Sequence, residues 1–238
     1  MSNDIRKDLS NSAGDYAHSG AKALIGAIPG IGGALSETFD LVISSPLSKR
    51  RDEWIIRICE QLMTLEERVD GFKLENLKDN ELFTTIVLNA SQIAMRTHQE
   101  QKKVALCNAC INTALDIKID ENKQLIFLNY INELTECDLR LLYFFENPLK
   151  RFEEKGLQTN SGYLGGSISQ ELYRYYPDLQ SEKNFINERV KYLYNNRLLD
   201  IENLNTMMSG SGIYASRLTE LGQEFMKYIL LNDNIRNY

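Results

Sequence analysis

The fold of the C-terminal part depends on one stretch, residues 181–225, with the sequence SEKNFINERVKYLYNNRLLDIENLNTMMSGSGIYASRLTELGQEF. Its first part has apolar residues at helical spacing, at Phe185, Ile186, Val190, Leu193 and Tyr194. A helix is therefore predicted from about Ser181. A short strand at 197–201, a tip at 207–212 that contains Gly and Ser, and a return strand at 213–217 are predicted next. Thr219 is then expected to cap a last helix.

Two shorter helices are predicted upstream of this stretch. Thr135 and Asp138 have the spacing of a capping box, with Asp in the place of the usual Glu, and they open a helix that Pro148 ends. The other helix runs from Ser169 to Tyr176 and stops before Pro177. Three short helices, a two-stranded ribbon and a final helix follow one another in the order of a winged helix.

The end of the ribbon supports this prediction. Residues Leu218–Phe225, with the sequence LTELGQEF, resemble the passage from strand to helix in many bacterial winged-helix domains. The resemblance covers about the last hundred residues and is one of architecture. We therefore expect a mainly α protein with two modules. These are an N-terminal antiparallel helical bundle over 1–131 and a C-terminal winged helix with a short tail over 132–238.

The N-terminal part has helical periodicity in most of its length. Its clearest stripe has apolar residues at spacings of three and four, at Trp54, Ile58, Leu62, Leu65 and Val69. Asp79 or Asn80 is expected to cap the next helix. The most unusual segment precedes both helices and is an apolar hairpin over 21–43, rich in Gly and Ala. Its turn consists of Ile28, Pro29, Gly30, Ile31, Gly32 and Gly33.

Charge and cysteine content restrict the partners and the compartment. The chain has a net charge of −6, and residues 1–132 and 133–238 each contribute −3. The basic field that usually accompanies strong nucleic-acid binding is therefore absent from both halves, and DNA contact would depend on a local patch. The four cysteines lie within apolar helical patterns, and Met1–Ser10 is polar, unlike a signal peptide. Both features predict a cytoplasmic, reducing location.

Sequence motifs of catalysis are scarce. Cys107-Asn108-Ala109-Cys110 has the spacing of a redox pair or of half a zinc site, but the chain has no second CxxC and only two histidines. We therefore assign both thiols to a helix core. The chain contains no P-loop, dinucleotide fingerprint, G-x-S-x-G elbow or H-E-x-x-H motif. We expect a protein that is not an enzyme and that needs no cofactor or metal.

The third helix of the predicted winged helix is the main candidate for a binding surface. In winged helices that bind DNA, this element enters the major groove. Here it and its C-terminal end present cations and an amide, which are Lys183, Asn187, Arg189, Lys191 and Arg197. Glu182 and Glu188 oppose a DNA role, and the tip between Ile201 and Tyr214 has no Lys or Arg. The leading hypothesis is a bacterial binding or regulatory protein that contacts a protein partner, a second copy of itself or DNA.

The hairpin supports an alternative hypothesis. The run 27–33 followed by Lys49-Arg50-Arg51-Asp52-Glu53-Trp54 is similar to a family of bacterial two-module proteins with no assigned activity, and the Gly-Pro turn resembles the N-terminal hairpins of membrane-active helical bundles. This resemblance implies a pore-forming or depolarising effector in anti-phage defence, with the winged helix as sensor or adaptor. The hairpin would then enter a membrane after a trigger. The structural alternative is that its small residues permit close packing in a core.

Overall fold

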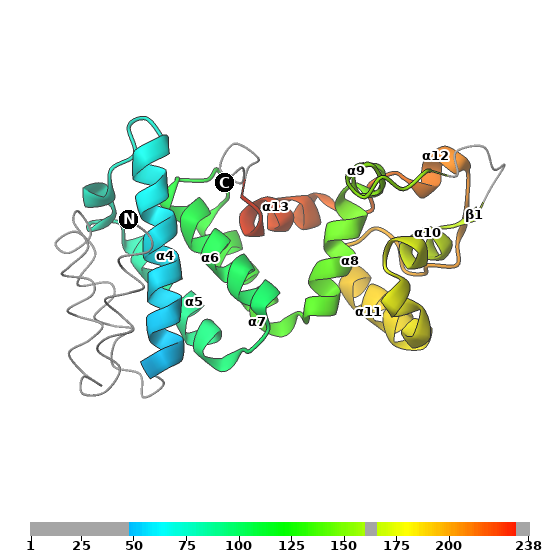
Figure 1. Cartoon of the computed structure of the whole chain (residues 1–238), viewed down its shortest axis with the longest axis horizontal. Coiled ribbons are helices and arrows are strands. Elements are labelled where there is room, and N and C mark those ends of the chain that lie inside the picture. Colours follow the sequence, from blue (N-terminus) through cyan, green and yellow to red (C-terminus); the bar gives the residue numbers. More distant parts are fainter. Residues whose placement is uncertain (1–47, 160–165, 232–238) are drawn as a thin grey trace. The chain divides into compact units, whose positions relative to one another are not determined.

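The computed structural model describes residues 48–159 and 166–231. The chain divides into two compact units, which meet in the sequence between Asn132 and Glu133, and Leu231 belongs with the first unit. Over the described residues the protein is mainly helical and has a small antiparallel sheet of two strands (Figure 1). The predicted hairpin over 21–43, with its turn at Ile28–Gly33, lies outside the described residues.

The first unit is built from helices that follow the predicted periodicity. Its elements are α4 (Ser48–Arg68), the 3-10 helix η1 (Leu74–Leu77), α5 (Glu81–Arg96), α6 (Glu100–Ala114) and α7 (Glu121–Glu133). Helix α5 packs along α6, and α4 contacts both. Trp54, Ile58 and Leu62 are buried, as their spacing predicts. The side chain of Asn80 accepts a hydrogen bond from the Phe83 N–H at 2.9 Å, which confirms Asn80 as the cap of α5.

The two thiols of the CxxC motif lie in the core of this unit, as predicted. Cys107 and Cys110 are on α6 and are almost completely buried. Burial raises the pKa of Cys107 to about 12 and also raises the pKa of Cys110 well above its usual value. Thiols in this state are poor nucleophiles and poor metal ligands. Val104, three residues before Cys107 on the same helix, is 45% exposed.

The second unit contains shorter elements. Its first part consists of α8 (Glu136–Glu146), α9 (Pro148–Glu154), β1 (Gly166–Ser167), α10 (Ile168–Tyr175), the 3-10 helix η2 (Pro177–Glu182) and α11 (Lys183–Asn195). Its second part consists of β2 (Met207–Met208), α12 (Gly210–Ile213) and α13 (Glu220–Ile229). Helix α8 contacts α9, α11 and α13. Aromatic rings fill the core where α8, α9 and α10 meet, and they belong to Phe144, Phe145, Phe152 and Tyr175.

The predicted capping box at the start of α8 is confirmed. The hydroxyl of Thr135 accepts a hydrogen bond from the Asp138 N–H at 3.3 Å, and Asp138 accepts one from the Thr135 N–H at 2.7 Å. The cap of the last helix is confirmed as well, since Thr219 accepts a hydrogen bond from the Gly222 N–H at 3.0 Å. Local sequence alone sets such caps, because the donor and the acceptor lie three residues apart.

The predicted β-ribbon is shorter than expected. Leu199 and Leu218 form one antiparallel bridge, and hydrogen bonds from Asp200 N–H to Arg217 O and from Thr219 N–H to Leu198 O extend it. The strand cannot begin at Arg197, because Arg197 directly follows the C-cap of α11 and has a φ of +61°, in the left-handed region. Glycine is required at Gly222, where a Cβ would overlap the carbonyl oxygen of Leu198.

The predicted flexible tip and return strand are wrong in detail. Met207 and Met208 form β2, which pairs with β1. Ser209 then caps the short helix α12, which includes Ile213, so the return strand does not start there. The Ile213 side chain is buried, and its Cδ1 would lie only 3.2 Å from a Cβ at Gly166. Packing of Ile213 on the glycine of β1 therefore draws residues 207–213 into a folded loop.

Candidate functional site

The exposed side of α11 lies beside a pocket of the second unit. Ile186, Val190 and Leu193 are buried along one side of the helix, as predicted, whereas Phe185 of the same predicted pattern is 48% exposed. Lys183, Asn187 and Lys191 are four residues apart and therefore share the other side. We call the side that carries Lys183, Asn184, Asn187, Lys191 and Asn195 the exposed face of α11.

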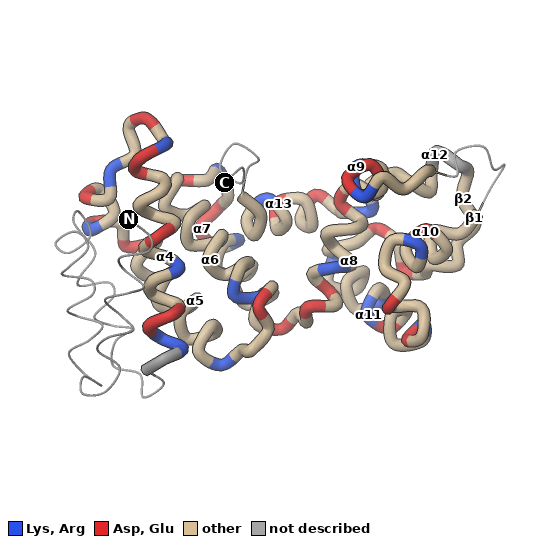
Figure 2. The backbone as a smooth tube through the Cα atoms, viewed as in Figure 1, with Lys and Arg blue, Asp and Glu red and all other residues tan. Residues whose placement is uncertain are grey.

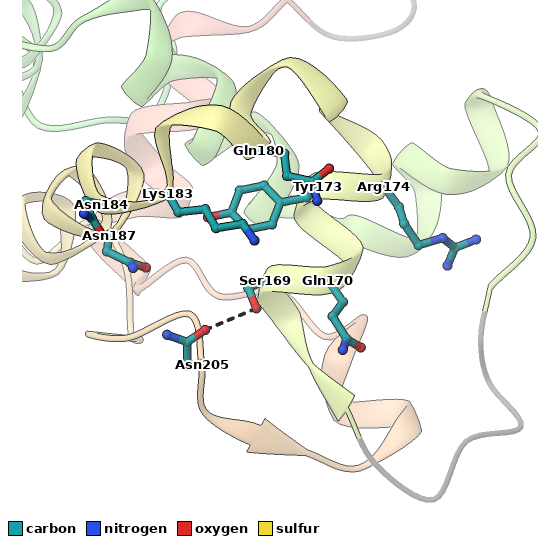
Figure 3. Close-up of a pocket in the computed structure, with 9 residues that line it drawn as sticks. All are labelled: Ser169, Gln170, Tyr173, Arg174, Gln180, Lys183, Asn184, Asn187 and Asn205. Atoms are coloured by element: carbon teal, nitrogen blue, oxygen red, sulfur yellow. Dashed lines mark hydrogen bonds between the residues drawn. The ribbon is translucent and has the colours of Figure 1, made fainter.

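The pocket has a volume of about 480 Å³ and is formed by α10, η2, α11 and the loop before β2 (Figure 3). Its lining is polar and consists of Ser169, Gln170, Tyr173, Arg174, Gln180, Lys183, Asn184, Asn187 and Asn205. Five of these nine side chains are amides, which can donate and accept hydrogen bonds at the same time. The nine lining residues include no carboxylate, histidine or thiol, and the pocket offers hydrogen bonds and positive charge.

Lys183 supplies the positive charge of the pocket. Its ammonium lies 5.6 Å from the centre of the Tyr173 ring, an arrangement that provides a weak cation–π contact. Within residues 48–159 and 166–231, no carboxylate lies within ion-pair distance of it. Burial raises the pKa of the Tyr173 phenol, so this hydroxyl stays protonated at neutral pH and can donate a hydrogen bond.

Arg174, the second cation of the lining, is already neutralised. It donates a hydrogen bond to Glu171 at 2.6 Å and another to the Gln158 carbonyl at 2.9 Å. The Tyr214 hydroxyl donates to the same carboxylate oxygen of Glu171 at 2.9 Å. Figure 3 shows the Arg174 side chain pointing away from Tyr173 and Lys183. The net charge of the pocket therefore comes from Lys183.

Asn187 places an unsatisfied acceptor at the pocket. Its Oδ1 atom is buried and has no hydrogen-bond partner within residues 48–159 and 166–231, unlike most buried polar atoms in folded proteins. Across the pocket, the hydroxyl of Ser169 donates to Oδ1 of Asn205 at 3.4 Å, and the Ser169 N–H donates to the Leu204 carbonyl at 3.2 Å. The hydrogen bonds of Ser169 thus hold the loop at Asn205 in place, while Oδ1 of Asn187 lacks a partner in the described part of the chain.

Arg189 lies on the side of α11 that faces α8, away from the pocket. Its Nε and Nη2 atoms donate to the two carboxylate oxygens of Asp138 at 2.7 and 2.8 Å. Asp138 is completely buried, and this bidentate contact raises the pKa of the Arg189 guanidinium further above its usual value. The guanidinium also lies 4.2 Å from the centre of the Tyr192 ring. Arg189 therefore joins α11 to α8 and is removed from the candidate site.

The remaining predicted cations do not line the pocket. Lys191 lies on the exposed face of α11, and its ammonium is 3.5 Å from Glu202, with both side chains 55% exposed. Arg197 is exposed at the end of the helix. Of the residues that line the pocket, Lys183 and Asn187 were predicted from the sequence, whereas those contributed by α10, η2 and the loop at Asn205 were not. These residues are dispersed along the sequence and come together only in the folded unit, so no local pattern could have indicated them.

Among residues 48–159 and 166–231, no helix is both long and apolar enough to cross a membrane. The hairpin residues Ile28–Gly33 fall outside this part of the chain, and their membrane role remains a prediction from the sequence. Comparison of the chain with models of protein families, with curated proteins and with solved structures found no match.

Proposed function

We propose that residues 133–230 form a binding module of the winged-helix type, through which a non-catalytic regulatory protein contacts its partner. The order α8, α10, α11, antiparallel bridge and α13 supports the winged-helix assignment. The observation that carries the proposal is the exposed face of α11, which opens onto a polar pocket. The ammonium of Lys183 in this pocket has no carboxylate within ion-pair distance among the residues that the structure describes.

The charges of this unit favour a protein partner or a second copy of the chain over duplex DNA. Basic and acidic residues are interspersed along the described chain (Figure 2). They form no continuous basic strip along α11 in this part of the chain. Arg217, the cation nearest the tip of the ribbon, directs its Nη2 to the Gly212 carbonyl. A duplex binder commonly neutralises several phosphates, for which this surface has too few free cations.

Site-specific photocrosslinking in cells tests the proposal and identifies the class of partner. A photoreactive amino acid replaces Asn184 or Asn195 on α11, and the exposed Asn89 on α5 is the matched control. We expect crosslinked species from the two α11 positions that are absent at Asn89. Protease sensitivity of the added mass would indicate protein, nuclease sensitivity would indicate nucleic acid, and twice the monomer mass would indicate self-association.

A charge reversal adds a second measurement. Lys183→Glu with Lys191→Glu should reduce the crosslinked species at least tenfold, because both side chains lie on the exposed face. Lys73→Glu with Lys78→Glu changes the same charge on exposed residues of the first unit and should have no effect. Absence of crosslinks at both Asn184 and Asn195 would overturn the proposal, and so would an equal loss with the control pair.

A further inference from the structure

The pocket beside α11 has one uncompensated positive charge. Arg174 is paired with the buried Glu171, whereas Lys183 has no carboxylate within ion-pair distance in the described part of the chain. The pocket is partly enclosed, so an anion near Lys183 would be less screened by solvent than one at a flat surface. A negatively charged group is therefore the first chemical feature expected of a ligand.

A hydrogen-bond donor is the second expected feature. Oδ1 of Asn187 is buried and unpaired, and a ligand N–H or O–H would satisfy it. A simple anion presents oxygen acceptors, which suit Lys183 and leave Asn187 unsatisfied. The ligand must then combine an anionic group with a polar part that carries donors.

The rest of the lining suits a nucleobase. Primary amides pair with base edges through one donor and one acceptor, and Gln170, Gln180, Asn184, Asn187 and Asn205 all lie around the cavity. The Tyr173 ring adds an aromatic surface of the kind on which bases stack. A volume of about 480 Å³ also lies within the usual range for small-molecule sites, about 300–1,000 Å³.

From this chemistry we infer that the pocket binds one nucleotide unit, with its phosphate at Lys183 and a donor group of its base or sugar at Oδ1 of Asn187. An acidic peptide has a carboxylate and N–H groups, but a single carboxylate side chain would leave the Tyr173 ring and most of the amides without a partner. The nucleotide unit is either a free nucleotide or the end of a single strand, since both present the same chemistry.

Isothermal titration of the full chain in low salt tests this inference. The probes are the four common nucleoside monophosphates, adenosine, ribose 5-phosphate, inorganic phosphate and a short glutamate-containing peptide. We expect at least one monophosphate to bind at least tenfold more tightly than phosphate, ribose 5-phosphate and the peptide. For adenosine monophosphate, binding should also be at least tenfold tighter than for adenosine. A 5′-phosphorylated hexanucleotide separates the two sources, since tighter binding of the hexamer indicates a strand end and equal or weaker binding indicates the free nucleotide.

Variants connect the binding to the two residues. Lys183→Gln should remove the advantage of a nucleotide over its nucleoside, whereas Lys191→Gln, which removes the same charge from the same helix outside the pocket, should leave the affinity unchanged. Asn187→Leu should weaken nucleotide binding at least tenfold without lowering Tm. The inference is overturned if no monophosphate binds at millimolar concentration, if phosphate alone or the peptide binds as tightly, or if Lys191→Gln has the same effect as Lys183→Gln.

The inference rests on the proposed function, because it assigns a ligand to the same module. The two can nevertheless fail separately. Crosslinking at Asn184 or Asn195 reports a macromolecule on the exposed face of α11, whereas titration reports a small molecule in the pocket. Crosslinks without nucleotide affinity would leave the binding module and overturn its ligand. Nucleotide affinity without crosslinks would leave the ligand and overturn the macromolecular partner.

Discussion

The charged side chains on the two sides of α11 differ in their partners. On the side toward α8, Arg189 forms a bidentate contact with Asp138, and the charges of these two side chains are matched. On the side toward the pocket, the Lys183 ammonium has no carboxylate partner in the described residues, and Asn187 has an unpaired oxygen. The same helix therefore provides an internal connection on one side and a candidate binding surface on the other. A cation on a predicted recognition helix can be assigned to binding only when its ion-pair partners within the fold are known.

A second pair of arginine and aspartate shows how burial changes the contribution of such a pair to stability. Arg140 on α8 donates to both carboxylate oxygens of Asp178 at 2.8 and 2.9 Å, nearly the geometry of Arg189 with Asp138. Asp178 is 61% exposed, whereas Asp138 is completely buried. Similar hydrogen bonds in such different surroundings should differ severalfold in their effect on stability, because an exposed pair is screened by water.

The largest effect is expected when the buried pair is broken. Arg189→Leu leaves the Asp138 carboxylate buried with only the two Thr135 contacts, which should lower the free energy of unfolding by about 3–5 kcal/mol. Lys191→Leu, two residues along the same helix, should change it by less than about 0.5 kcal/mol. Urea unfolding followed by circular dichroism measures both values. Equal, small losses from the two variants would contradict a structural role for Arg189.

The second-largest loss of stability is expected at Thr135, the other hydrogen-bond partner of the Asp138 carboxylate. Thr135→Ala removes the cap of α8 and the 2.7 Å hydrogen bond from the Thr135 hydroxyl to Asp138, which should cost about 1 kcal/mol. The exposed Thr206, whose hydroxyl donates to the Asn203 carbonyl, is the control, and its replacement by Ala should have little effect on the same urea curves. A loss as large as that of Arg189→Leu would show that the cap, and not the arginine, holds Asp138.

The exposed pair should contribute less, and its contribution should depend on pH. The hydrogen bonds from Arg140 lower the pKa of Asp178 below its usual value. A lowered pKa in the folded state stabilises the protein above the unfolded value of about 3.9, and this stabilisation is lost as the pH falls through the lower folded value. Asp178→Asn should therefore cost at most about 1 kcal/mol at pH 6, and the difference from the wild type should vanish at lower acid pH. A difference that persists at pH 2 would contradict this linkage.

The smallest effect is expected on the pocket side. Asn187→Leu removes an acceptor that has no partner in the free protein, so the unfolding free energy should stay within about 0.5 kcal/mol of the wild type or rise. Differential scanning calorimetry measures this change. A clear loss of stability would mean that Asn187 has a structural role, and the contrast between the two sides of α11 would then fail.

Local features of the fold were predictable because their partners lie close in the sequence. The capping box of Thr135 and Asp138, the cap of Asn80 and the cap of Thr219 each join residues three positions apart. The buried stripe of α4 and the core position of Cys107 and Cys110 follow from helical periodicity. In these cases the backbone geometry of one helix is sufficient to decide the contact.

The sheet and the roles on α11 were not predictable from the same signals. Strands β1 and β2 have two residues each, too few to show an alternating pattern, and their pairing depends on how α12 packs on Gly166. The pocket is assembled from α10, η2, α11 and the loop at Asn205, so its amides are dispersed in the sequence. The sequence predicts both Arg189 and Lys183 as cations on the binding surface of one helix. Only the position of α8 in the folded unit distinguishes the two side chains.

The sequence by itself determined a mainly helical chain and where several of its helices begin. It also determined the burial of the main apolar stripe of α4, of the two thiols of α6 and of Ile186, Val190 and Leu193 in α11. Tertiary structure alone decided which polar groups are satisfied within the fold and which remain open to a ligand. The physical reason is distance along the chain. Periodicity and caps act over three or four residues, whereas Arg189 meets a carboxylate 51 residues away and Lys183 meets none in the described structure.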